Sequence, residues 1–134
     1  MVDASVVFSW VYPGQAFAET DQLLMEIEAG PVVVVPSLCF LEVANSLLAT
    51  RRRKLITATE RKATLTRLSN LNFIVDDETG CAAFRKTSEL AEKYGLSVYD
   101  AAYLEAAIRR KLPLASRGHP LRAAAKRCGV KLRA

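Results

Sequence analysis

The stretch Gly30-Pro-Val-Val-Val-Val-Pro-Ser37 decides the fold class. Four consecutive β-branched residues, Val32 to Val35, are typical of a strand that is buried on both faces, as strands of parallel sheets are. A proline ends this strand, and Ser37 can cap the helix that the sequence predicts over residues 38–50. The glycine and proline before the strand end an earlier helix, predicted over residues 15–29.

Short apolar runs and longer helical patterns alternate along the rest of the chain. Strands that alternate with helices imply a parallel sheet covered by helices on both faces. We therefore expect an α/β fold, a three-layer α/β/α sandwich with a central parallel sheet, as one domain over residues 1–134. The further helices are predicted over residues 57–71, 77–94, 98–110 and 118–128, and the further strands over residues 73–75, 112–115 and 130–132.

The composition is that of an ordinary globular protein, with 51% hydrophobic and 25% charged residues. The longest aliphatic run is far shorter than the ~20 residues of a membrane span, and no export leader is recognised, so we expect a cytoplasmic protein without a membrane partner. Three widely spaced cysteines exclude a complete disulfide framework and a CxxC zinc site, and they fit a reducing compartment.

Several common enzyme classes are disfavoured by missing motifs. No GxGxxG and no GxxxxGK[ST] follows a predicted strand, so dinucleotide and P-loop chemistry are not expected. No GxSxG is present, and His119 is the only histidine, which leaves little for a Ser-His-Asp hydrolase. The residues that remain to be explained are acidic.

The charge of the chain is divided unevenly along its length. No acidic residue follows Glu105, whereas nine Lys and Arg residues lie between Arg109 and Arg133, and the net charge is +5. A basic end of this kind fits a nucleic acid or an acidic protein partner. Solvated helix faces explain the same pattern equally well on charge alone.

Glu42 is unusually placed in the helix predicted over residues 38–50. This helix is apolar nearly all round, and Glu42, Asn45 and Ser46 form its one polar wedge. A helix so apolar is expected to be mostly buried, and a buried carboxylate is costly unless it is paired or bound to metal. The alternative is that the wedge meets solvent at the edge of the sheet.

Asp3 and Asp100 are the other two candidates. Asp3 ends the first apolar run, where a turn residue is also common. Asp100 lies three residues after Ser97, so it can serve as part of a helix cap. On the helical wheel, however, Asp100 lies on the apolar side of its helix, and Glu105 and Arg109 are expected on the exposed side.

Three carboxylates that converge without cationic neighbours repel one another and raise one another's pKa. A hard divalent cation removes this repulsion, and an oxygen-only set of ligands suits Mg²⁺ or Mn²⁺ better than zinc. Acidic magnesium sites characteristically serve phosphoryl chemistry. In this interpretation, the basic residues between 109 and 133 hold a polyanion near the acidic pocket.

Three segments in this order resemble the PIN-domain family, and most closely the VapC-type toxins of bacterial toxin–antitoxin pairs. These segments are Asp3-Ala-Ser5, Glu42-Val-Ala-Asn45-Ser-Leu47 and Tyr99-Asp-Ala-Ala-Tyr-Leu-Glu-Ala-Ala107. The resemblance covers essentially the whole chain.

The resemblance implies a parallel-sheet sandwich and a Mg²⁺- or Mn²⁺-dependent endoribonuclease that acts on structured RNA such as tRNA or rRNA. It implies that Asp3, Glu42 and Asp100 bind the metal and position the attacking water, and that Ser5, Asn45 and Ser116 support these carboxylates. It also implies a homodimer, an antitoxin partner that blocks the site, and contact with operator DNA only through the antitoxin.

One departure from the family pattern affects the expected activity. The family usually has Ala-Thr-x-Asp after the fourth strand, and here the matching stretch is Ala115-Ser-Arg-Gly118, so Gly118 replaces a fourth acid. We therefore predict that one Mg²⁺ binds through Asp3 and Asp100 and that turnover is slow. The alternative is a catalytically degenerate PIN-like module that binds RNA or an antitoxin without cleaving. A phosphoryl-receiver domain fits less well, because Asp3 has no paired acid beside it.

Overall fold

Parallel strands form the centre of the fold in the computed structural model, which describes residues 1–12, 18–30 and 32–133. Strand β1 (Val34–Pro36) pairs in parallel with β2 (Ile74–Asp76), in the register Val34 to Ile74. The N–H of Val2 donates to Val34 O at 3.0 Å, which places the start of the chain on the other side of β1. Parallel bridges then join Val2 to Ala115 and Leu114 to Leu132.

The order across this sheet is therefore β2, β1, Val2, Ala115 and Leu132, with parallel pairing. The strands predicted over residues 112–115 and 130–132 are shortened to these bridges. Pro113 lies in the first of them and has no N–H to donate to a ladder, which limits its length.

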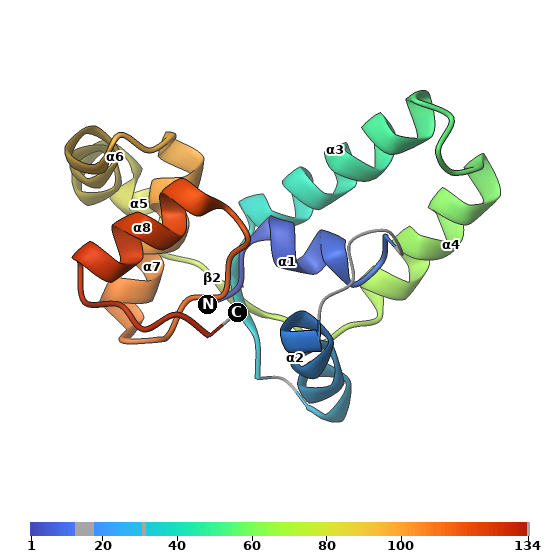
Figure 1. Ribbon diagram of the computed structural model, residues 1–134, viewed down its shortest axis with the longest axis horizontal. Coiled ribbons are helices and arrows are strands. Elements are labelled where there is room, and N and C mark those ends of the chain that lie inside the picture. The colour runs from blue at the N-terminus through green and yellow to red at the C-terminus, as the bar shows by residue number, and fades with distance from the viewer. Residues whose placement is uncertain (13–17, 31, 134) are drawn as a thin grey trace.

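Helices lie on both sides of these strands, which confirms the predicted α/β class (Figure 1). On one side lie α1 (Ala4–Ser9), α2 (Ala18–Ala29), α3 (Leu38–Arg52) and α4 (Ala58–Ser69). On the other lie α5 (Thr79–Ala82), the π-helical segment η2 (Ala83–Thr87), α6 (Ser88–Tyr94), α7 (Val98–Arg110) and α8 (His119–Arg127). The first residues of the helix predicted over 15–29 lie outside the described residues.

The capping residues explain several helix boundaries. Thr57 Oγ1 accepts from the N–H of Glu60 at 3.0 Å, and Ser97 Oγ accepts from the N–H of Asp100 at 3.0 Å, as the sequence predicts. Gly95 ends α6 in the left-handed conformation, with φ of 64°. Ser37 does not act as predicted, because it has helical dihedral angles and its side chain makes no capping bond.

The expectation that the helix of Glu42 is mostly buried is wrong. Helix α3 buries a single stripe at fourth-residue spacing, of which Cys39, Val43 and Leu47 are part. Phe40 and Leu41 on its other faces are 43% and 75% exposed. The reason is visible in Figure 1, where α3 and α4 extend away from the strands, so that only one side of α3 meets the body of the molecule. In the described part of the chain, no helix has the length and hydropathy to cross a lipid bilayer.

Candidate active site

Asp3 directly follows Val2, the central position in the order of the sheet, and caps helix α1. Its backbone is extended, and its Oδ1 accepts from the N–H of Val6 at 3.2 Å and from Ser5 Oγ at 2.5 Å. Ser116, which is fully buried, donates its hydroxyl to Oδ2 of Asp3. The carboxylate is itself only 5% exposed, so these donors replace the water that it would otherwise contact.

The two serines connect Asp3 to the segment that precedes α8. The N–H of Arg117 donates to Ser5 Oγ at 2.9 Å, and the N–H of Gly118 donates to Ser116 Oγ at 3.0 Å. The start of the chain and residues 116–118 are thereby held together by side-chain hydroxyls. Ser5 and Ser116 thus contact the carboxylate that they are predicted to support, whereas Asn45 is exposed on α3.

Glu42 is held by Tyr103, a residue that the sequence analysis did not single out. The Tyr103 hydroxyl donates to Oε2 of Glu42, which joins α7 to α3. Tyr103 is 1% exposed, and burial raises the pKa of its phenol, so it stays a hydrogen-bond donor. Its position three residues after Asp100, on the same face of α7, is the one signal in the sequence that could have identified it.

Asp100 is in the first turn of α7 and is half-buried. Its N–H is bound by the Ser97 hydroxyl, so the capping interaction that the sequence offers as an alternative is present. The carboxylate nevertheless interacts electrostatically with the other two candidates. The cap and the proposed site role are therefore compatible, because they use different atoms of Asp100.

The three carboxylates share one electrostatic environment. Burial raises the pKa of Asp3, although its hydrogen bonds with Ser116 and Ser5 act in the opposite direction. Burial and then the charge of Asp3 raise the pKa of Asp100. Burial also raises the pKa of Glu42, with further contributions from Asp100 and Asp3. The charge of Asp3 thus acts on both Asp100 and Glu42, and the charge of Asp100 acts on Glu42.

The types of donor atom in this set suit a hard divalent cation, but their arrangement is less suited to one. The candidate ligands are carboxylate and hydroxyl oxygens, and a positive charge among them would offset the repulsion. Across residues 1–12, 18–30 and 32–133, however, no three His, Cys, Asp or Glu side chains are grouped as a ready-made metal site. Asp3 and Glu42 instead accept hydrogen bonds from hydroxyl groups.

The glycine at position 118 leaves room for a side chain. Gly118 is the N-cap residue of α8, with φ of −70° and ψ of 114°, which any residue adopts. A Cβ at this position would lie 3.4 Å from Ser116 Oγ and 3.9 Å from Leu121 Cβ. The missing fourth acid therefore does not reflect a lack of space. His119, the next residue, is exposed at the start of α8.

A second buried aspartate, Asp76, lies at the end of β2 and has the opposite electrostatic character. Both of its oxygens accept from Arg109, at 2.9 and 2.8 Å, and Arg110 Nε donates to it at 2.5 Å. These guanidinium groups hold the pKa of Asp76 well below its usual range. Glu105 also pairs with Arg109 at 2.8 Å and is only 4% exposed, so the expectation that Glu105 lies on the exposed side of α7 is wrong.

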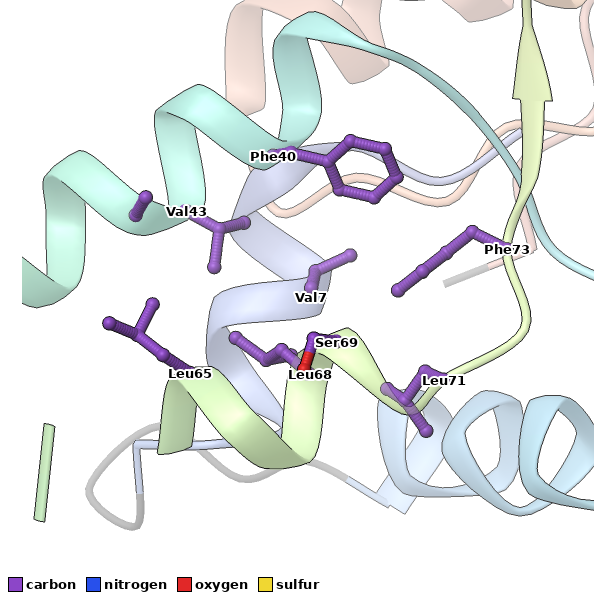
Figure 2. Close-up of a pocket in the computed structure, with 9 residues that line it drawn as sticks. Val7, Phe40, Val43, Leu65, Leu68, Ser69, Leu71 and Phe73 are labelled. Carbon is purple, nitrogen blue, oxygen red and sulfur yellow. The ribbon is translucent and has the colours of Figure 1, made fainter. Parts of the chain in front are cut away.

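An apolar cavity of about 400 Å³ lies between α1, α3 and α4 (Figure 2). Figure 2 shows Phe40 and Val43 of α3 facing Leu65 and Leu68 of α4 across it. The remaining lining residues are Val7, Ala44, Ser69, Leu71 and Phe73. This cavity contains no acidic or basic residue among those that line it, so it is a packing surface and not a catalytic one.

Comparisons with known proteins agree with this fold. The chain is similar to a protein described as PAE2754 from Pyrobaculum aerophilum, with a TM-score of 0.68 and 22% identity over 92% of this chain and 76% of the other. It is also similar to a toxin–antitoxin complex from Klebsiella pneumoniae, with a TM-score of 0.55 and 20% identity over 87% of this chain and 84% of the other. At these identities the two structures show the fold alone. No curated protein matches the chain. The family model of the PIN domain matches residues 1–127, and the chain therefore belongs to the PIN-domain family.

Proposed function

We propose that this protein is a metal-dependent endoribonuclease and the toxin of a toxin–antitoxin pair. The observation that supports this most strongly is that the charge of Asp3, which follows a strand position of the parallel sheet, raises the pKa of both Asp100 and Glu42, and that Asp100 also raises the pKa of Glu42. PIN domains are generally nucleases, and a structure similar to this chain is that of a toxin–antitoxin complex.

The proposed cofactor is Mg²⁺, with Mn²⁺ as a substitute, held through Asp3 and Asp100 with Glu42 beside them. When bound, such a cation lowers the pKa of a water molecule and offsets charge on a phosphate. The chain's own residues do the positioning. Ser5 and Ser116 fix the orientation of Asp3, and Tyr103 fixes that of Glu42.

A PIN-like module that binds RNA or an antitoxin without cleaving is the second candidate. Gly118 favours it, because the fourth acid of the family pattern is missing there. Tyr103 and the serines favour retained activity, because a site that has lost its chemistry has no need of donors that orient its carboxylates. We therefore propose slow cleavage rather than none.

The proposed partners follow from the surfaces of the molecule. We propose that an apolar helix of the antitoxin packs in the cavity between α3 and α4, and that operator DNA is reached only through the antitoxin.

The proposed location is the cytoplasm. The three cysteines are unpaired, which fits this reducing compartment.

We also propose a homodimer. Around a cavity of about 570 Å³ between β2 and α7, Val75, Val98 and Tyr99 are 43%, 47% and 66% exposed, and Phe84 of η2 is 97% exposed next to Ala83 of its lining. An exposed apolar group of this kind typically marks a protein interface. A second copy of this chain is the occupant that we propose.

Cleavage of a tRNA pool tests the proposed function. Wild-type protein in Mg²⁺ should cut the RNA, EDTA should stop the reaction, and Glu42→Gln should abolish it. Glu92→Gln, an exposed carboxylate on α6, is the matched control and should cut normally. RNA that stays intact with wild-type protein, or a Glu42→Gln variant as active as wild type, would exclude the proposed ribonuclease site.

A further inference from the structure

We propose that a cavity lined by Arg117, Arg122 and Arg133 binds a phosphate group of the RNA backbone next to the bond that is cut. This inference rests on the proposed function, since it names how the same site recognises its substrate. The cavity has a volume of about 420 Å³ and is lined also by Glu19, Thr20 and Ser116. It therefore collects residues from the start of α2, the segment before α8, α8 itself and the end of the chain.

The cavity adjoins the acidic site through Ser116 and Arg117. Ser116 lines the cavity while its hydroxyl donates to Asp3. The N–H of Arg117 donates to Ser5 Oγ, and Ser5 in turn donates to Asp3. A group bound in the cavity thus lies two hydrogen bonds away from the carboxylate. A phosphate bound here would therefore lie beside the proposed site.

The charge of the cavity distinguishes it from the rest of the basic end of the chain. Of the nine basic residues after Glu105, Arg109 and Arg110 are committed to the buried Asp76, so they stabilise the fold. Three others line this one cavity, of which Arg133 is paired with Glu26, and Glu19 is the only acid among the described lining residues. The basic end is therefore not a uniform solvated face. Part of its charge is concentrated beside an acidic site that would otherwise repel a polyanion.

The guanidinium groups are also oriented by the protein. Arg122 Nη1 donates to the carbonyl oxygen of Ser116 at 2.8 Å, and Arg133 pairs with Glu26 of α2. An arginine fixed in this way presents a planar set of donors that matches the oxygens of a phosphate. A lysine supplies the charge without this geometry, which gives the proposal a specific test.

Binding of a fluorescently labelled RNA hairpin in EDTA, followed by anisotropy, tests the inference without requiring cleavage. Arg122→Gln should weaken binding severalfold and reduce the slope of log K against log salt by about 1, as expected for one lost phosphate contact. Arg117→Gln should behave in the same way, and Arg122→Lys should restore only part of the affinity. The matched control is Arg85→Gln, an exposed arginine on η2, which should bind like wild type.

Four results would overturn the inference. The first is an unchanged affinity for the hairpin in both Arg122→Gln and Arg117→Gln, and the second is an equal loss of affinity in Arg85→Gln. The third is inorganic phosphate alone binding as tightly as the hairpin. The fourth is an Arg122→Gln variant that loses affinity for hexaglutamate but not for RNA, because the cavity would then serve an acidic protein. A wild type that binds the hairpin through these arginines but never cleaves it would refute the proposed enzyme and support the phosphate site.

Discussion

Asp3 and Asp76 are both buried aspartates at the ends of strand positions on either side of β1, and their surroundings shift their pKa in opposite directions. Burial raises the pKa of Asp3, although the hydrogen bonds that it accepts from Ser116 and Ser5 act in the opposite direction. Asp76 accepts hydrogen bonds from two guanidinium groups, which lower its pKa. Asp76 thus stabilises the fold, whereas the negative charge of Asp3 still needs a counter-charge.

Asp76→Asn should therefore destabilise the protein strongly. Removing one partner of a buried ion pair costs about 3–5 kcal/mol, and here it removes the carboxylate that Arg109 and Arg110 share, although Arg109 keeps Glu105 and Glu78. The lowered pKa means that this stabilisation is present above the unfolded pKa of about 3.9 and is lost as the pH falls toward the folded value. Urea unfolding at pH 7 and at pH 3 checks it. A difference between variant and wild type that is small at pH 7, or larger at pH 3 than at pH 7, would contradict this assignment.

Asp100→Asn should behave in the opposite way in EDTA. The raised pKa of Asp100 means that its contribution to stability is present below the unfolded pKa and is lost as the pH rises through the folded value. The variant should thus melt at a higher temperature than wild type at pH 7, with no difference near pH 4. Mg²⁺ should raise the melting temperature of wild type more than that of the variant. A variant that melts lower than wild type at pH 7 in EDTA would argue against repulsion at this site.

The sequence identifies the three carboxylates and the two serines that contact Asp3, but not Tyr103 or the ion pairs of Asp76. Asp3, Glu42 and Asp100 are recognisable because each is an acid within or beside an apolar pattern. The pairing of Asp76 with Arg109 spans 33 positions and joins the end of β2 to the last turn of α7, where the local sequence indicates only solvated charge. Long-range pairing of this kind depends on tertiary packing, which periodicity does not contain.

At the scale of elements, prediction succeeded where caps and periodicity agreed. Helix α7 has the predicted bounds of 98–110, with Ser97 as its cap and an apolar face toward the core. Helix α1 was not predicted, because six residues are too few to show a period. The helix predicted over residues 77–94 is divided into α5, η2 and α6, since the extra residue of a π-helical turn leaves no clear mark on the hydrophobic pattern.

The proposed loss of a fourth acid can be tested by adding a carboxylate at the start of α8. Gly118→Asp should raise both Mn²⁺ affinity and EDTA-sensitive RNA cleavage by about tenfold, because the position has room for a carboxylate beside Ser116. Gly118→Asn is the matched control, since aspartate and asparagine cap a helix equally well but only aspartate adds charge. Equal activity in the glycine, aspartate and asparagine proteins would show that a fourth acid at this position does not limit the site.

At the scale of the whole molecule, the exposed apolar group around Phe84 predicts the oligomeric state. Wild-type protein should sediment as a dimer, and Phe84→Glu should shift it toward the monomer. Because Phe84 is 97% exposed, its substitution should change the stability of the single chain by no more than about 0.5 kcal/mol. Sedimentation equilibrium at several concentrations checks this, and a wild type that is monomeric throughout, or a variant that dimerises equally well, would contradict the proposed face.

The α/β class followed from one buried strand and the alternation around it, but the extent of the sheet did not. Strands of three residues and single bridges suffice here, because β1 and the chain start are enclosed by helices on both sides. The sequence does not predict that α3 and α4 extend outward. The hydrophobic pattern of an apolar helix is the same whether its second face packs against the core or against a partner. Which of the two this face contacts depends on how the whole molecule is assembled.

The central claim is that Asp3, Glu42 and Asp100 act together to bind one divalent cation. Isothermal titration of Mn²⁺ into wild type, Asp3→Asn and Asp100→Asn measures this directly, and Asp3→Asn is suitable because asparagine retains the cap of α1. We expect one Mn²⁺ per wild-type chain and a loss of affinity of about tenfold or more in each variant. Equal affinity in all three proteins would contradict the account.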